Sequence, residues 1–188
     1  MFHVDIKKSL EILRRGGVIL YPTDTVWGIG CDATNRIPVE RIYAVKQRSE
    51  ARTMLTLVDG WDMLADYMDD VPDIAVQLME ETAKPLSIIY PKAKNLASNL
   101  IAQDGSIGIR VVREPFCQQL IKAFGKPVVS TSANISGKPT PGTFNEISDE
   151  IKEAVDYIVR WRQDDRQPAT TSSIIQLEVD GSYRVIRN

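Results

Sequence analysis

Short hydrogen-bonding side chains follow a predicted buried strand in the segment VVSTSANISG, residues 128–137. Its valines give way to serine and threonine hydroxyls, among them Ser132, and then to the amide of Asn134. An amide both donates and accepts hydrogen bonds, as binding of a base or a ribose requires. The pattern favours a loop that presents these groups to a ligand, and a simple turn is the alternative for Asn134.

A second polar segment, PTDTVWGIG at residues 22–30, also follows a predicted strand directly. It offers the hydroxyls of Thr23 and Thr25, the carboxylate of Asp24 and two glycines, which let the backbone approach a ligand closely. It matches neither the dinucleotide fingerprint G-x-G-x-x-G nor a phosphate loop ending in G-K-[ST]. The alternative is a capped turn in which Thr23 and Asp24 satisfy the backbone locally.

Three cations, Lys46, Arg48 and Arg52, lie close together near the end of a predicted helix. Arg48 has the planar fork that grips a phosphate through two hydrogen bonds, and Lys46 supplies a point charge. The alternative is a solvated helix end, because the helix macrodipole by itself stabilises cations at this position.

Arg110 lies inside the otherwise apolar strand IGIRVV, residues 107–112. A buried arginine is costly unless it is paired, so Arg110 either meets a carboxylate of the protein or binds an anionic ligand. Because side chains alternate along a strand, Arg110 points to the same face as Gly108 and Ser106, which would leave room for a ligand beside it. The sequence leaves both partners of Arg110 open.

The remaining residue types narrow the chemistry. The single histidine, His3, lies near the N-terminus, which argues against a histidine-centred triad or a metal site with several histidine ligands. Catalysis would then use lysines, arginines, hydroxyls, carboxylates, backbone amides and at most a loosely held metal ion. That set suits reactions of phosphates and carboxylates in which the protein stabilises charge.

Length and charge are those of an ordinary globular protein. The 188 residues carry a formal net charge of −2, with 43% hydrophobic and 26% charged residues. This charge argues against nonspecific binding of nucleic acid, although it leaves a local basic groove open. No apolar run approaches the roughly 18 residues of a membrane span. Cys31 and Cys117 lie far apart and predict two reduced thiols in a cytoplasmic protein.

The elements that must position these groups alternate between helices and strands. Helices are predicted up to the Gly16-Gly17 pair and over residues 38–48, 61–67, 73–82, 116–124 and 147–155. Strands are predicted over residues 18–22, 54–58, 86–91, 106–112, 127–132 and 156–160, with a final hairpin around Asp180-Gly181. This order predicts one α/β domain over residues 1–188, a twisted mixed sheet with flanking helices.

Taken together, the segments PTDT, KxR, GIRV, STSAN-x-SG, TSS and IR, in this order, resemble the YrdC-like family of L-threonylcarbamoyladenylate synthases. The resemblance runs from about Val18 to Arg187. It implies a twisted sheet with a concave, positively lined cavity. It also implies a nucleotidyltransferase that converts L-threonine, bicarbonate and ATP, with Mg²⁺ on the nucleotide, into threonylcarbamoyl-AMP and pyrophosphate. In the family, a partner complex passes the threonylcarbamoyl group to adenosine 37 of tRNAs that read codons beginning with A.

The resemblance also implies roles for single residues. The KxR pair would be catalytic and face the phosphates, and an arginine would receive the carboxylate of threonine. The implied ATP-binding residues are Lys46, Arg48, Arg52, Ser106, Ser132, Asn134, Thr143 and Arg187, and the implied threonine-binding residues are Thr25, Arg110 and Ser173. No protein ligand for a metal ion is implied.

Some positions depart from the family pattern. Leu57 stands where a histidine that contacts threonine occurs in the family, and Arg52 stands where a small polar residue is common. A paralogous group has lost the SAN sequence, which is intact here and indicates the active branch. Two alternatives stay open: a module of this fold that binds tRNA, double-stranded RNA or ribosome precursors, and a carbamoyl-handling enzyme with another acceptor, similar to the related domain of hydrogenase-maturation proteins.

Overall fold

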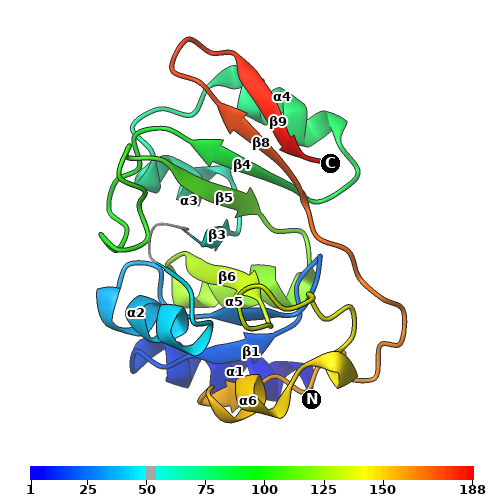
Figure 1. Ribbon diagram of the computed structural model, residues 1–188. Coiled ribbons are helices and arrows are strands. Elements are labelled where there is room, and N and C mark those ends of the chain that lie inside the picture. Colours follow the sequence, from blue (N-terminus) through cyan, green and yellow to red (C-terminus); the bar gives the residue numbers. More distant parts are fainter. Residues whose placement is uncertain (50–53) are drawn as a thin grey trace.

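The computed structural model describes residues 1–49 and 54–188, so Arg52 lies outside the described residues. Within the described part, nine strands form one twisted mixed sheet in the order β7-β1-β2-β6-β3-β5-β4-β8-β9, and helices pack around it (Figure 1). None of the helices described is both long and apolar enough to cross a membrane. The predicted α/β fold with a mixed sheet is confirmed.

The elements are short. The helices are α1 (Phe2–Arg14), α2 (Arg36–Val45), α3 (Trp61–Tyr67), α4 (Asp73–Glu81), α5 (Pro115–Phe124) and α6 (Asp149–Glu153), with a 3-10 turn η1 (Phe144–Glu146). The strands are β1 (Ile19–Tyr21), β2 (Gly28–Gly30), β3 (Leu55–Val58), β4 (Leu86–Tyr90), β5 (Ile107–Val111), β6 (Val128–Ser132), β7 (Tyr157–Ile158), β8 (Ser173–Leu177) and β9 (Tyr183–Arg187). The predicted helices and strands agree with these elements to within a few residues.

The sheet has two parts that meet where β6 pairs with β3. In the first part, β1 lies between parallel β7 and antiparallel β2, and β2 pairs with β6. In the second part, β5 lies between parallel β3 and antiparallel β4, β4 is parallel to β8, and β8 and β9 form an antiparallel hairpin. The antiparallel contact that joins the parts, here called the seam, pairs residues 55–57 with residues 128–130. A site that crosses the seam draws on both parts.

Helix α5 shows how local sequence sets the ends of an element. Pro115 stands at its first position, and the Glu114 carboxylate accepts the backbone N–H of Cys117 at 2.8 Å, which satisfies a donor that the helix leaves open. Gly125 ends the helix in the left-handed conformation with φ of 74°, as the sequence predicts. The helix therefore places its buried face, with Phe116 and Leu120, against the sheet core.

Strand β2 is the element that the sequence pattern does not predict. Its residues, Gly28–Gly30, carry little side-chain information, so alternation cannot be read from them. Glycine is needed at Gly30 because an added Cβ would lie 2.3 Å from the Val129 carbonyl oxygen and 2.6 Å from the Tyr21 ring. The two glycines therefore mark close packing of β2 between β1 and β6.

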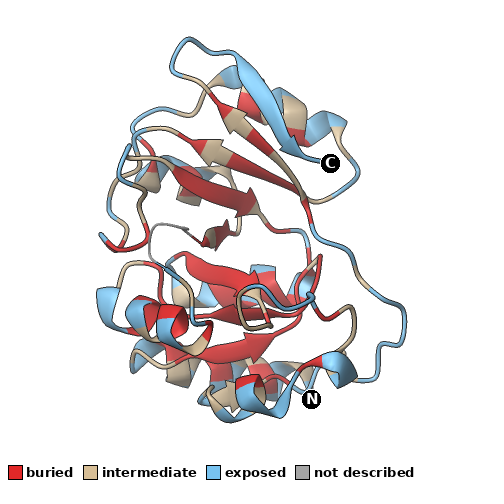
Figure 2. Cartoon of the chain, in the orientation of Figure 1, coloured by how far each residue is buried: buried red, intermediate tan, exposed pale blue. Residues whose placement is uncertain are grey.

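Burial is concentrated in β1, β2 and β6 of the first part and in β3 to β5 of the second (Figure 2). Cys31 and Cys117 are buried free thiols, as predicted. Strand β9 lies at one edge of the sheet, and each of its residues is exposed. The hairpin that carries it turns at Gly181, whose φ of 85° explains the predicted Asp-Gly signal.

Candidate functional site

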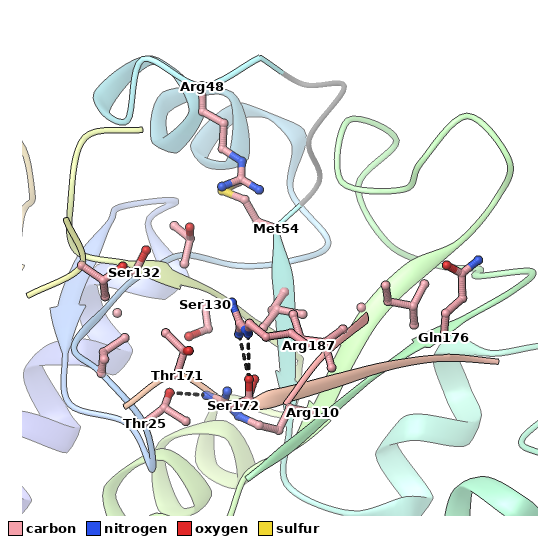
Figure 3. Close-up of a pocket in the computed structure, with 18 of the residues that line it drawn as sticks. Thr25, Arg48, Met54, Arg110, Ser130, Ser132, Thr171, Ser172, Gln176 and Arg187 are labelled. Atoms are coloured by element: carbon pink, nitrogen blue, oxygen red, sulfur yellow. Dashed lines mark hydrogen bonds between the residues drawn. The ribbon is translucent and has the colours of Figure 1, made fainter. Parts of the chain in front are cut away.

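A groove of about 450 Å³ lies over the seam (Figure 3). The loop after β1 and residues of β2, β3, β5, β6, β8 and β9 line it, so both parts of the sheet contribute. Six residues expected from the sequence come together here: Thr25, Arg48, Ser106, Arg110, Ser132 and Arg187. Their positions along the chain are far apart, and only the sheet order makes them neighbours.

Arg110 of β5 is 3% exposed and meets a carboxylate of the protein, which is one of the two partners that the sequence leaves open. Its Nη2 lies 3.0 Å from Oδ1 of Asp24, an ion pair whose angle does not meet that of a hydrogen bond, and it donates to Oγ1 of Thr25 at 3.2 Å. Its Nε is buried and has no hydrogen-bond partner among the described residues. Arg110 also lines the groove together with Ser106 and Gly108, so a guanidinium with one unsatisfied donor borders a ligand-sized space.

The PTDT loop is held from several sides. The Thr23 hydroxyl accepts the backbone N–H of Thr25 at 3.0 Å and donates to the Val26 carbonyl at 2.8 Å, so the capped-turn interpretation is right for Thr23. Behind the loop, Nη1 of Arg162 donates to the Thr23 carbonyl at 3.0 Å and the Cys117 thiol donates to the carbonyl of Pro22 at 3.2 Å. Thr25 is thereby fixed where it meets the groove.

The two members of the KxR pair point in different directions. Arg48 lines the groove, as Figure 3 shows. Lys46, the C-terminal cap of α2, is 1% exposed and donates from Nζ to the carbonyls of Ser132 and Asn134 at 2.5 and 2.6 Å. Burial first, and then the charge of Arg48, lower the pKa of Lys46 from 10.5 to about 8. In this geometry Lys46 fixes the serine-rich loop and does not line the groove.

Within that loop, Ser132 lines the groove and Asn134 closes the turn. Nδ2 of Asn134 donates to the carbonyls of Ile135 and Lys138 at 3.1 and 2.8 Å, which matches the turn interpretation. Oδ1 of Asn134 is buried without a hydrogen-bond partner in the described part of the chain. The asparagine therefore keeps one acceptor unsatisfied while its donor shapes the loop.

Strands β8 and β9 bring a further arginine. Nε and Nη2 of Arg187 both donate to the Ser172 carbonyl, at 3.0 and 2.8 Å, and Figure 3 shows these contacts beside Arg110. Burial, and then the charge of Arg110, lower the pKa of Arg187. Ser173 does not line the groove, because Ile174 and Gln176 occupy the groove face of β8 and alternation turns Ser173 away.

Thr143 also lies away from the groove. Its hydroxyl and the carboxylate of Glu146 form a capping box at η1, in which each side chain accepts a backbone N–H of the other residue. Thr140, three residues earlier, lines the groove instead.

Sequence reasoning missed several lining residues: Ser130, Thr140, Thr171 and Ser172. The signal for Ser130 is present, because it precedes Ser132 by two positions on β6 and alternation puts both on one face. Leu57, the departure from the family pattern, pairs with Arg110 across β3 and β5 but is fully buried and does not line the groove.

The charge of the groove is positive. The described lining residues include four arginines but one carboxylate, that of Asp104. The arginines are Arg48, Arg110, Arg184 and Arg187. Asp104 accepts the backbone N–H and the hydroxyl of Ser106 at 2.9 and 2.6 Å, and these bonds lower its pKa. Such a groove stabilises an anionic ligand.

Two proteins with a known name are similar to most of this chain. A threonylcarbamoyl-AMP synthase of Pseudoalteromonas translucida is 36% identical over 157 residues, which cover 82% of this chain and 84% of that protein. A protein of the same name from Vibrio cholerae is 32% identical over 165 residues, covering 86% and 88%.

Solved structures give the same picture of the fold. The crystal structure of E. coli YciO is 29% identical, with a TM-score of 0.84 over the whole chain and 90% of YciO. The P. abyssi Sua5 structure complexed with L-threonine is 23% identical, with a TM-score of 0.83 over 97% of this chain; the chain spans about half of Sua5 (53%). The family model Sua5_yciO_yrdC, described as "Telomere recombination", matches residues 11–188. The chain therefore belongs to the Sua5/YciO/YrdC family.

Proposed function

We propose that the protein is an enzyme, an L-threonylcarbamoyladenylate synthase. The observation that carries this proposal is Arg110, a buried arginine that lines the groove beside Thr25 and keeps Nε without a partner among the described residues. An amino-acid carboxylate would satisfy that donor and would add a negative charge where two guanidinium groups, of Arg110 and Arg187, lie close together. The names of the relatives agree with this choice.

The reaction fits a groove made of cations and hydroxyls. The amine of threonine attacks the carbon of bicarbonate, water leaves, and a carbamate results. A carbamate oxygen then attacks the α-phosphorus of ATP, the bond to the β-phosphate bridging oxygen breaks, and pyrophosphate leaves. Because the carbamate is already anionic, the protein needs no histidine base, and its work is positioning and charge stabilisation.

The nucleotide would use the cations and polar groups of the same groove. Arg48 and Arg187 would contact the phosphates, and Ser132 and Ser106 the rest of the nucleotide. Lys46 would act by fixing the loop of Ser132. Arg52 remains part of this proposal but lies outside the described residues.

Magnesium would arrive on the triphosphate. The described residues hold no group of three or more histidine, cysteine or acidic side chains that could bind a metal ion. Mg²⁺ is commonly held by one or two carboxylates together with substrate phosphates, and Asp104 is a carboxylate placed in the groove. Such an ion would neutralise charge on the leaving pyrophosphate.

The product implies the partners. Threonylcarbamoyl-AMP would pass to a transfer complex that modifies adenosine 37 of tRNA, in the cytoplasm, and the chain would act as one domain of residues 1–188. The competing RNA-binding role has less support, because a groove of about 450 Å³ has the size of a small-molecule site. Direct binding of tRNA or double-stranded RNA would need a basic surface that a net charge of −2 does not favour.

The test is incubation of the protein with ATP, Mg²⁺, bicarbonate and each amino acid in turn, with pyrophosphate as the measured product. The proposal expects release that depends on both threonine and bicarbonate. Release with bicarbonate and a different acceptor would favour the other carbamoyl-handling enzyme. No release under any condition, together with tight binding of RNA, would favour the RNA-binding module.

A further inference from the structure

Both arginines of β9, Arg184 and Arg187, line the groove, although residues three apart on a regular strand point to opposite faces. The register of the hairpin explains this. Adjacent residues 174 and 175 of β8 pair with Arg187 and Val185, so the ladder skips Ile186 and a β-bulge results. A bulge re-aims the side chains that follow it, and here it turns Arg187 to the face of Arg184.

Arg184 is held at the rim of the groove. Its Nη2 donates to Oε1 of Gln176 at 2.9 Å, and its Nε lies 3.2 Å from Oε1 of Glu178. Gln176 itself lines the groove, at the β8 side of the view in Figure 3. These two contacts use Nη2 and Nε, and Nη1 takes part in neither of them. The side chain of Arg184 is 62% exposed. The guanidinium is therefore oriented but accessible.

Arg187, the other arginine of β9, is also held by the protein. Arg187 donates Nε and Nη2 to the Ser172 carbonyl, and its Nη1 takes part in neither of these hydrogen bonds. Two oriented guanidinium groups on one strand suit a chain of linked phosphates, which offers several charged oxygens, better than a single carboxylate. Asp104, the one carboxylate among the described lining residues, suits a divalent cation that accompanies such phosphates.

We propose that Arg184 binds the polyphosphate part of a nucleoside triphosphate, and the pyrophosphate formed from it, at the rim of the groove, and that Glu178 competes with the phosphate for its guanidinium. This inference rests on the proposed function, in which ATP is a substrate. No family motif identified in the sequence includes Arg184, and the bulge is what brings it into line with Arg187.

The experiment measures the binding of two ligands, pyrophosphate and AMP, each with Mg²⁺, by titration calorimetry. Arg184→Ala should raise the Kd for pyrophosphate about fivefold to tenfold, the low end for a charge-assisted contact because the side chain is mostly exposed. The same variant should bind AMP with a Kd within about twofold of the wild-type value. Glu178→Gln should lower the Kd for pyrophosphate, by about twofold to threefold. Lys7→Ala, an exposed cation of α1 at the other end of the molecule, is the control with the same charge change.

The results decide between the inference about Arg184 and its failure, and they separate that failure from a failure of the proposed function. The inference is overturned if Arg184→Ala binds pyrophosphate like the wild type, if it loses pyrophosphate and AMP equally, or if Lys7→Ala has the same effect. Threonine-dependent release of pyrophosphate by the wild type, measured separately, keeps the proposed function standing in all these cases. A wild type that releases no pyrophosphate and binds none overturns both. Thermal unfolding of Arg184→Ala checks that the variant is folded.

Discussion

Arg110 combines an internal ion pair with a place in the lining of the groove. The ion pair with Asp24 lowers the cost of burying the guanidinium, while Nε has no hydrogen-bond partner among the described residues. The sequence predicts that Arg110 is buried and which face it occupies, but it cannot choose between a salt bridge and a substrate contact. The structure shows the salt bridge, and the substrate contact stays a prediction.

Replacing Arg110 with methionine should therefore have two separable effects. Arg110→Met should abolish threonine-dependent release of pyrophosphate, and it should lower the unfolding free energy by about 3–5 kcal/mol because the Asp24 carboxylate loses its counter-ion. The double variant Arg110→Met/Asp24→Asn should recover much of the stability and stay inactive. Denaturant unfolding and the pyrophosphate assay check this; substantial activity in either variant would remove Arg110 from the substrate site.

Arg48 is the groove-lining member of the KxR pair. Arg48→Ala should cut adenylate formation severely and leave the fold intact, since a lost charge-assisted contact to phosphate removes roughly 1.5–3 kcal/mol. The pyrophosphate assay and circular dichroism measure the two effects. Arg14→Ala, an exposed arginine at the end of α1, serves as the control. Near-normal turnover of Arg48→Ala would contradict the assignment.

Lys46 should make stability depend on pH. Its pKa is about 8 in the folded protein and 10.5 in the unfolded chain, so between these values the folded state binds fewer protons than the unfolded state. Stability then rises with pH across this window, and below pH 8 the gain is absent. From pH 8 to 9.5, the wild type should gain roughly 1–2 kcal/mol relative to Lys46→Met. Urea unfolding of both proteins at several pH values is the measurement, and parallel pH curves would refute the shifted pKa.

At the scale of elements, periodicity and turn residues predict α5, the β8–β9 hairpin and most of the other elements. They fail for β2, because glycines carry no alternation, and they cannot place Lys46, whose inward direction depends on how α2 meets the end of β6. Ser173 and Thr143 show the same limit, since motif spacing does not say which face a residue occupies or which hydroxyl already caps a helix. Contacts between segments that are distant in sequence decide which face a residue occupies and which hydroxyl caps a helix.

The glycines of β2 provide a matched pair for a packing test. Gly30→Ala should lower the unfolding free energy by about 3 kcal/mol, because its Cβ would lie 2.3 Å from a backbone oxygen of β6 that cannot move without the sheet. Gly28→Ala should cost about 1 kcal/mol or less, because its nearest neighbour, at 3.1 Å, is the rotatable hydroxyl of Ser130. Thermal and denaturant unfolding compare the two. Equal losses would mean that β2 does not pack as described.

At the scale of the whole molecule, the groove crosses the seam between the two parts of the sheet. A ligand that contacts Ser132 on β6 and Arg110 on β5 would connect the parts, so opening of the seam would require its release. ATP together with threonine should slow amide hydrogen exchange in residues 55–57 and 128–130 more than in α1. Exchange followed by mass spectrometry, with AMP alone for comparison, measures this. Equal slowing in α1 and at the seam would indicate only global stabilisation.

The sheet order also has a kinetic consequence. Strand β1 pairs with β7 and strand β4 with β8, so segments from both halves of the chain must meet before the groove has all its walls. Such long-range pairings form late and slow the search for the folded state. A ligand that recognises the completed groove binds only after that search is over. Substrates should therefore lengthen the lifetime of the folded protein by slowing its unfolding, while the rate at which new chains fold stays the same.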